Sequence, residues 1–209
     1  MEKAVFVEWT RWLSVLHTNL AMASRATRIA TVVSEFPIGE CSILDVGSGN
    51  GNLAFAIMQI RHDIHIQGMD VLLWPSLKIP TTRFDGKTIP ARDGEWDYCL
   101  VSDVLHHCDE PSELLAELKR VSKKGIIIKD HVAASGYDHA ILSFMDWFGN
   151  RGHGVRLAYK YWSWQRWRAE FANHDLLPKY IVRKLDLYPW PLSWVFDRRL
   201  HFVALLEKS

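Results

Sequence analysis

The chain has 209 residues, of which 48% are hydrophobic and 23% are charged, a composition typical of one globular domain with a sizeable core. Its formal net charge of +1 gives no overall field that would attract nucleic acid or an acidic membrane surface. The sequence has no apolar run of the roughly 18 residues that a membrane-spanning helix needs, no signal-peptide layout, and no disulfide-framework spacing of its three cysteines. We therefore expect a single-domain protein of the cytoplasm.

Residues 1–37 are expected to form two helices, because apolar residues recur at helical spacing in both halves of this segment. The simplest interpretation is that both helices cover a sheet, so that residues 1–38 form an N-terminal helical cover. The alternative is that the first helix, which carries Trp9 and Trp12, forms a lid or a weakly membrane-seeking face.

A short apolar run, Ile43 to Val46, leads into glycines at alternate positions and then into a helix-forming segment, Leu53 to Met58. An open α/β sheet builds a nucleotide-type site from this order of strand, glycine turn and helix, at the carboxyl ends of its strands. Glycine suits such a turn because it tolerates positive φ and lets a ligand approach bare backbone.

The spacing of these glycines separates two kinds of cofactor site. A dinucleotide fingerprint, G-x-G-x-x-G, would need a third glycine where this chain has Asn52, which disfavours an NAD(P) oxidoreductase. The pattern present, D-x-G-x-G-x-G, resembles the first motif of class I methyltransferases that depend on S-adenosyl-L-methionine (SAM). In that family the loop passes under the methionine part and the sugar of the cofactor. The resemblance implies SAM as the cofactor, bound by Asp45, Gly47, Ser48, Gly49, Asn50 and Gly51.

A second strand is expected at about residues 65–69, and Asp70 follows it. A carboxylate at the end of this strand can accept two hydrogen bonds from the vicinal hydroxyls of a ribose. NAD enzymes use the same arrangement, so Asp70 does not by itself identify the cofactor, and a helix cap or turn is its plain structural alternative. Val71 would then provide apolar surface beside the adenine.

The third expected strand, residues 81–84, is followed by Asp85 and Gly86. In many methyltransferases an acidic residue at this place accepts a hydrogen bond from the adenine amino group. The resemblance implies that role for Asp85, with Gly86 letting the base lie close. As plain structure, Asp-Gly is a turn signal.

The fourth expected strand, residues 96–101, is followed by Ser102 and then by Val-Leu-His-His and an Asp-Glu-Pro helix start. This form resembles the fourth-strand motif of small-molecule methyltransferases, a group that includes the ubiquinone and menaquinone C-methyltransferases. The resemblance implies that Ser102 also contacts the cofactor. DNA- and glutamine-methylating enzymes carry Asn/Asp-Pro-Pro-aromatic here, and its absence argues against a nucleic-acid substrate.

Further helices are expected at residues 111–122, at residues 140–148 and after a Ser163 cap, and further strands at residues 125–129, 180–187 and 200–206. In the helix after Ser163, a stripe of Trp164, Trp167 and Phe171 indicates core more than substrate pocket. With the resemblance, these elements predict an α/β fold. Its sheet would be doubly wound, Rossmann-like and seven-stranded, mostly parallel with an antiparallel last strand. Within one domain, residues 42–131 would form the cofactor-binding core, and residues 137–209 the substrate-side cover and closing strands.

Methyl transfer from a sulfonium is an in-line displacement, so the protein must mainly hold the acceptor in position and exclude water. A base is needed only if the acceptor carries a proton. The candidates are His131 first and His106 second, with Asp130 orienting a histidine; for each histidine a structural role is the alternative. A metal site built from the adjacent residues 106–108 is rejected because neighbours in sequence rarely face one ion.

The substrate would lie under a cover formed by the N-terminal helix, residues 137–162 and residues 188–196, which are rich in aromatic side chains. We therefore expect a small apolar or aromatic acceptor, such as a quinone, polyketide or lipid-like metabolite. The expected binding partner is therefore a small-molecule acceptor and not a nucleic acid. Weak membrane association and the oligomeric state stay open. The alternative is a non-catalytic accessory protein that keeps the fold and acts through its aromatic surface.

Overall fold

The computed structural model describes residues 24–150, 157–188, 190–197 and 199–209. The first expected helix, with Trp9 and Trp12, lies outside these ranges. Residues 24–34 are helical, in agreement with the second expected helix. Among the described residues, no helix combines the length and apolar composition that crossing a membrane requires.

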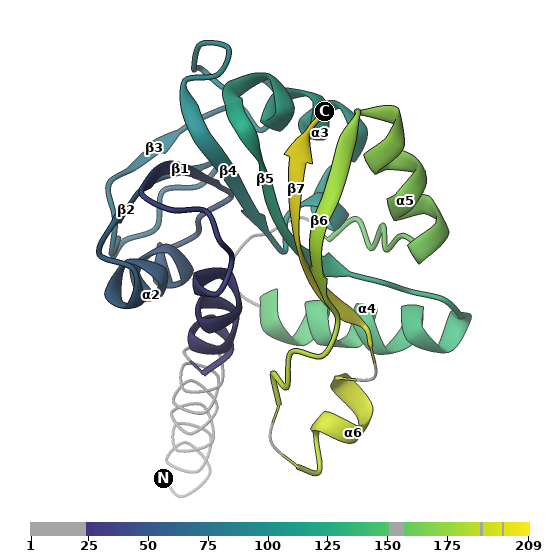
Figure 1. Cartoon of the computed structure of the whole chain (residues 1–209). Helices are drawn as coiled ribbons and strands as arrows, with labels where there is room; N and C mark the ends of the chain where they lie inside the picture. Colours follow the sequence, from purple (N-terminus) through teal and green to yellow (C-terminus); the bar gives the residue numbers. More distant parts are fainter. Residues whose placement is uncertain (1–23, 151–156, 189, 198) are drawn as a thin grey trace, which may run out of the picture.

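Seven strands form one sheet in the order β3-β2-β1-β4-β5-β7-β6 (Figure 1). The strands from β3 to β5 pair in parallel, whereas β7 is antiparallel to both of its neighbours, β5 and β6. The predicted seven-stranded, mostly parallel sheet with an antiparallel last strand is therefore confirmed. The strands are β1 (Cys41–Val46), β2 (Ile64–Asp70), β3 (Thr81–Arg83), β4 (Trp96–Ser102), β5 (Ser122–His131), β6 (Leu176–Val182) and β7 (His201–Lys208).

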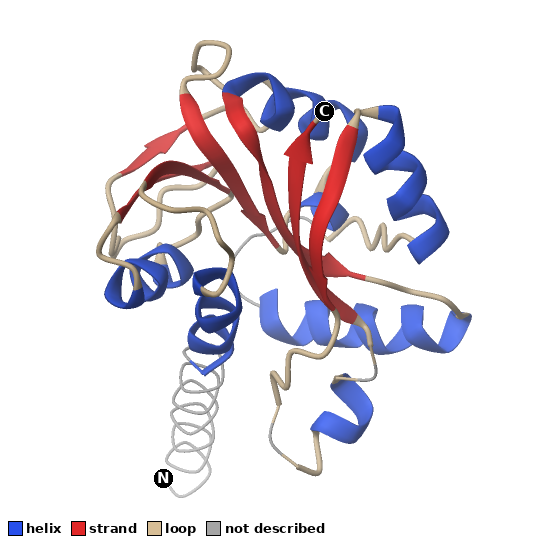
Figure 2. Ribbon diagram, viewed as in Figure 1, coloured by secondary structure: helices blue, strands red, loops and turns tan. Residues whose placement is uncertain are grey.

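Helices cover both faces of this sheet (Figure 2). They are α2 (Asn52–Ile60), the 3-10 turn η1 (Leu105–His107), α3 (Pro111–Val121), α4 (Gly136–Asn150), α5 (Trp164–Asn173) and the short α6 (Ser193–Phe196). Alternate residues of the central strands enter opposite cores: Leu44 packs with α3 and α5, whereas Ile43 packs with α2 and the helix at residues 24–34. This alternation is expected for a strand buried on both faces.

Helix α4 crosses the end of the sheet, and α6 lies below it in the view of Figure 1. A third, smaller core joins these two helices, with Leu142 of α4 fully buried and Val195 of α6 packed against the cluster that contains it. Tyr161 and Leu200 belong to the same cluster. The carboxyl ends of β4 and β5 therefore face helices rather than open solvent.

The helix after Ser163 forms as predicted, and its aromatic stripe is core. The Ser163 hydroxyl accepts a hydrogen bond from the Arg166 backbone N–H at 3.3 Å, which caps α5. Trp167 and Phe171 are 2% and 1% exposed. The ring of Trp167 packs against that of Phe202 of β7, and Phe171 belongs to the same core cluster. The core interpretation of this stripe is confirmed.

Two strands differ from their predicted bounds. Strand β5 begins at Ser122 instead of residue 125, because its first residue already pairs with Trp96 of β4. Strand β6 runs from Leu176 to Val182 instead of residues 180–187, because Leu176 is buried and pairs with Lys208. Beyond β6 the chain leaves extended geometry, and Asp186 has a φ of +50°.

Candidate functional site

The glycine loop after β1 is fixed by backbone hydrogen bonds and by close packing. The Gly47 N–H donates to the Met69 carbonyl at 2.7 Å, and the Gly51 N–H donates to the Ser48 carbonyl at 2.9 Å. The three glycines at 47, 49 and 51 have φ values of +77°, +58° and +79°, a conformation that side chains with a Cβ rarely adopt.

The three glycines differ in what surrounds them. A Cβ at Gly47 would lie 2.3 Å from Val104 Cγ2, and a Cβ at Gly51 would lie 2.6 Å from Ile79 Cγ1. At Gly49 the nearest atom would be Trp74 Nε1, at 3.9 Å. Packing therefore excludes a side chain at the two outer glycines, whereas the middle glycine leaves open space beside the loop.

Asp70 joins the end of β2 to this loop. Its Oδ2 accepts the Gly49 N–H at 2.7 Å, and its Oδ1 accepts the Leu72 N–H at 2.9 Å. Asp45, the next-to-last residue of β1, is only 2% exposed, and burial together with the nearby Asp70 raises the pKa of its carboxyl group to about 7. Two expected cofactor residues, Asp45 and Asp70, therefore lie together at the glycine loop.

The turn after β3 lies against the end of β2. A Cβ at Gly86 would be 2.9 Å from Val71 Cγ1, so these two expected adenine-flanking residues are neighbours. The exposed Asp85 accepts the backbone N–H groups of Lys87 and Thr88 at 2.8 and 2.9 Å, and these bonds lower the pKa of its carboxyl group. Asp85 thus forms a turn of the kind that Asp-Gly indicates, and its contact with adenine stays a prediction.

Ser102 ends β4 half-buried, and the next residue, Asp103, was not singled out from the sequence. Asp103 has a φ of +57°, and its carboxylate forms ion pairs with the fully buried Lys129 and, at 3.8 Å, with Arg25. Burial would raise the pKa of Asp103, but the two cations lower it well below its usual range. The only sequence signal that could have identified Asp103 as an ion-pairing residue of the site was its position directly after Ser102.

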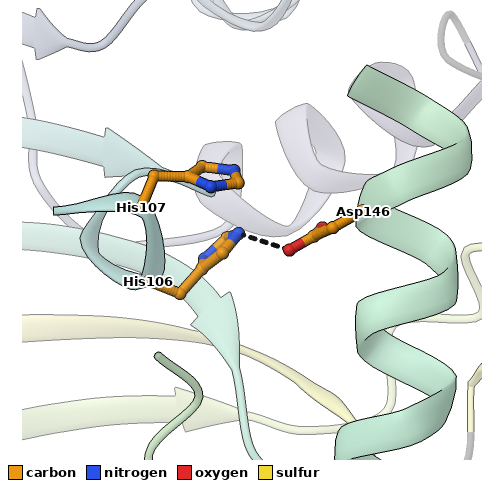
Figure 3. A group of neighbouring side chains, drawn as sticks. All are labelled: His106, His107 and Asp146. Carbon is orange, nitrogen blue, oxygen red and sulfur yellow. Dashed lines mark ion pairs between the residues drawn. The ribbon is translucent and has the colours of Figure 1, made fainter. Parts of the chain in front are cut away.

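His106 lies at the centre of a buried polar cluster. Its Nδ1 is 2.7 Å from Asp130 Oδ1, and its Nε2 is 3.2 Å from Asp146 Oδ2 on α4 (Figure 3). The Tyr161 hydroxyl donates to the same Asp146 carboxylate. Burial alone would lower the pKa of His106, but Asp130 and Asp146 outweigh it and raise the pKa to about 10. His106 is therefore an imidazolium at neutral pH.

His131 ends β5 and is 3% exposed. Its Nδ1 is 3.4 Å from Asp130 Oδ1 and 3.5 Å from Asp103 Oδ1, and its own backbone N–H donates to Asp130 Oδ1 at 2.7 Å. Burial and the neighbouring Lys129 ammonium bring the pKa of His131 well below its usual value. His131 is therefore neutral at pH 7, with a free lone pair, and its lowered pKa makes it a weaker base than an exposed histidine.

The structure thus brings His106, Asp130 and His131 together, and adds Asp146 and Tyr161, which sequence reasoning missed. Asp146 lies in the second half of α4, and no spacing rule relates it to His106, which is 40 positions earlier. Tyr161 follows a loop and packs its ring 5.4 Å from that of His106, measured between centroids. Only the tertiary fold places these side chains in one cluster.

A family model described as a methyltransferase domain matches residues 44–128, the span from β1 to β5. Residues 44–128 are therefore similar to a methyltransferase domain. An uncharacterized methyltransferase of Mycobacterium tuberculosis is 28% identical over 137 residues, which are 60% of this chain and 48% of the relative. One of Mycobacterium leprae is 31% identical over 130 residues, which are 56% of this chain and 41% of the relative. The matches therefore span less than half of each relative.

Solved structures share the architecture around the methyltransferase domain. The SAM-dependent methyltransferase of Mesorhizobium loti aligns with a TM-score of 0.62 at 12% identity, over 88% of this chain and 98% of that one. The likeness shows the class I SAM-dependent methyltransferase fold.

Proposed function

We propose that the protein transfers the methyl group of SAM to a small apolar or aromatic metabolite. The observation that carries this proposal is the glycine loop, where Gly49 is open to a ligand while Asp70 holds its backbone N–H. In this proposal the Asp70 carboxylate accepts hydrogen bonds from the ribose hydroxyls, and the neighbouring Val71 and Gly86 flank the adenine. Asp45, Ser48, Asn50 and Ser102 complete the proposed cofactor contacts.

The transfer itself is an in-line displacement in which the acceptor attacks the methyl carbon of the sulfonium. The sulfur leaves with its bonding electrons. The protein must therefore mainly position the acceptor against the methyl carbon and exclude water from the site, and chemical activation is less important. If the acceptor carries a proton, His131 is the proposed base because it is neutral and can accept one. His106 already holds a proton between two carboxylates, so its part would be electrostatic, with Asp130 fixing the ring.

The proposed acceptor class rests on the aromatic side chains beyond the carboxyl ends of β4 and β5. Phe144, Trp147 and Phe148 are exposed on α4, and Trp190 and Trp194 are exposed beside and within α6. Such surfaces suit a quinone, polyketide or lipid-like acceptor, in line with the resemblance to the ubiquinone and menaquinone C-methyltransferases. Trp162 serves the core instead, because its ring packs 4.7 Å from that of Trp167, measured between centroids. The proposed location is the cytoplasm.

The deciding experiment is a calorimetric titration with SAM and, separately, with NADH. The wild type is compared with Gly49→Val and with Gly39→Val, a matched control whose φ of +60° carries the same backbone strain with no atom within 4 Å of the added Cβ. We expect micromolar SAM binding, about −8 kcal/mol, in the wild type and in the control, and none in Gly49→Val. NADH should not bind.

Loss of SAM binding in both glycine variants would indicate a general effect of backbone strain and would remove the argument from Gly49. A wild type that does not bind SAM would contradict the proposed activity. The accessory-protein alternative would then lead, and the exposed aromatic residues of α4 and α6 would be examined as a partner surface. If SAM binds, an acceptor screen that follows release of the demethylated cofactor tests the proposed substrate class.

A further inference from the structure

Three side chains from two separate segments converge beside the proposed acceptor site. His106 and His107 come from η1, and Asp146 comes from α4 (Figure 3). The two imidazole rings lie with centroids 4.0 Å apart, and one potential ligand atom from each of the three residues lies within 4.8 Å of the others. We propose that His106, His107 and Asp146 form a binding site for a divalent transition-metal ion of the Zn²⁺ class.

The first argument is the spacing between His106 and Asp146. The His106 Nε2 atom is 3.2 Å from Asp146 Oδ2. Two ligand atoms bound to one zinc ion at about 2.0–2.1 Å, with a tetrahedral angle between them, lie about 3.3 Å apart. The observed separation is therefore that of two ligands of one ion. A lone pair of the imidazole and a carboxylate oxygen would repel each other at this distance, so a positive charge must lie between them.

The second argument is the partner of the other His106 nitrogen. Its Nδ1 is 2.7 Å from Asp130 Oδ1, a hydrogen bond that fixes the ring and directs Nε2 toward Asp146. Metal-binding histidines almost always donate their second ring N–H to a carboxylate or carbonyl in this way. Tyr161 donates to the same Asp146 oxygen, Oδ2, and so orients that ligand as well.

The third argument separates a metal ion from a lone proton. The 3.2 Å contact between His106 Nε2 and Asp146 does not have hydrogen-bond geometry, and a proton there would not satisfy His107. The buried His107 Nδ1 has no hydrogen-bond partner among the residues that the structure describes, and an unsatisfied buried polar atom costs about 1–3 kcal/mol. Metal binding would release the Nε2 proton that His106 carries in the metal-free protein, and the ion would then satisfy the two imidazoles and the carboxylate together.

The charges and the donor types fit the proposed ion. Asp130 and Asp146 carry two negative charges around the position of the ion, whereas Asp103 has its own cation in Lys129. Two imidazole nitrogens and one carboxylate favour Zn²⁺ and related transition metals, because Mg²⁺ and Ca²⁺ prefer oxygen ligands. Three protein ligands also leave a fourth position open, as in zinc sites that bind water or a substrate oxygen.

A second candidate group, His106, Asp130 and His131, fits less well. Its shortest pair, His106 Nδ1 and Asp130 Oδ1 at 2.7 Å, is a direct hydrogen bond and is too short for a tetrahedral pair of zinc ligands. His131 also lies beside the Lys129 ammonium, which would repel a cation.

From the sequence, a metal site at residues 106–108 is rejected because neighbours in sequence rarely face one ion. The structure corrects this point: the rings of His106 and His107 lie on the same side with centroids 4.0 Å apart, and Asp146, in place of Cys108, is the third residue of the group.

The test is a calorimetric titration of chelator-treated protein with ZnCl₂, without SAM or acceptor, so it is independent of the proposed methyl transfer. We expect one zinc ion per chain at micromolar or lower Kd. His107→Gln and Asp146→Asn should each weaken binding by at least tenfold, and Asp130→Asn by 10–100-fold. The matched control is His65→Gln, because His65 is an exposed histidine of β2 outside the cluster.

Circular dichroism and melting of each variant show whether the fold is retained. If His107→Gln does not fold, Asp146→Asn and the absorption spectrum of wild-type protein titrated with Co²⁺ provide the decision, since tetrahedral cobalt gives intense visible bands. Wild-type protein that binds neither ion at tens of micromolar would overturn the proposal. Binding that is equally strong in the His107 and Asp146 variants, or that is lost in His65→Gln, would overturn it too.

Discussion

The Asp45 carboxyl group is buried near the end of β1, and its ionisation opposes folding. Burial and Asp70 raise its pKa from 3.8 to about 7. Between these values the folded protein holds a proton that the unfolded chain has released, so the free energy of unfolding falls as pH rises through this window. This contribution is fully present below pH 3.8 and is lost above about pH 7.

Asp45→Asn should remove this pH dependence. We expect the wild type to lose roughly 2–3 kcal/mol relative to Asp45→Asn between pH 5 and pH 8, at 1.36 kcal/mol per pKa unit. Urea denaturation of both proteins at the two pH values measures the difference. An equal change in both proteins would show that Asp45 does not carry the effect.

The glycines at 47 and 49 allow the cost of positive φ to be separated from the cost of a clash. Alanine at either position adds a left-handed residue, about 1–2 kcal/mol. At Gly47 the new Cβ also meets Val104 Cγ2 at 2.3 Å, and a valine side chain has little freedom to turn away. Gly47→Ala should therefore be less stable than Gly49→Ala by a further 1–3 kcal/mol, roughly, in urea denaturation. Equal losses would contradict the packing argument.

At the scale of elements, Gly125 sets the distance between β5 and β7. A Cβ there would lie 2.0 Å from the Leu206 carbonyl oxygen and 3.0 Å from the Glu207 Cα, so the two strands would have to move apart. We expect Gly125→Ala to cost about 2–3 kcal/mol. Gly136→Ala, with nothing within 4 Å of the added Cβ, is the matched control and should change stability little. Thermal unfolding of both variants checks this, and similar melting temperatures would refute it.

The elements that could be predicted from the sequence are those with local signals at their ends. Ser163 caps α5, and Pro111 begins α3, so both helices form close to the expected bounds. Strand β6 lacked such a signal. Buried and exposed residues do not alternate along β6, and Pro178 lies within it at the edge of the sheet. Its first residue, Leu176, is set by pairing with Lys208 at the end of β7. Long-range pairing, which no local pattern contains, decided its bounds.

At the scale of the molecule, one part of the candidate site depends on local sequence signals and the other on tertiary packing. The proposed cofactor side rests on local sequence signals: Asp45 to Gly51 are consecutive residues, and Asp70 and Asp85 each lie at the end of an expected strand. The cluster around His106 could be predicted only in part, since Asp130 follows β5 directly but Asp146 and Tyr161 arrive through the packing of α4 and a loop. The sequence argument therefore identified a histidine and its carboxylate, but not the second carboxylate that gives His106 a partner on each nitrogen.

The stability of the whole molecule should depend on SAM, because the proposed site joins the ends of β1, β2 and the turn after β3, and the unfolded chain has no such site. At a SAM concentration 100 times Kd, binding to the folded state alone adds about 2.7 kcal/mol, which for a chain of this size corresponds to a melting-temperature rise of roughly 5–10 °C. The same concentration of NADH should have no effect.

Asp70→Ala provides the control for this linkage, because Asp70 would lose both the proposed ribose contact and its bond to the Gly49 N–H. The variant should melt below the wild type without ligand and should respond to SAM much less. A SAM-induced rise that Asp70→Ala retains in full would mean that the cofactor binds elsewhere in the chain. Because the unliganded loss and the lost response are measured separately, structural and ligand roles of this carboxylate can be distinguished in one thermal series.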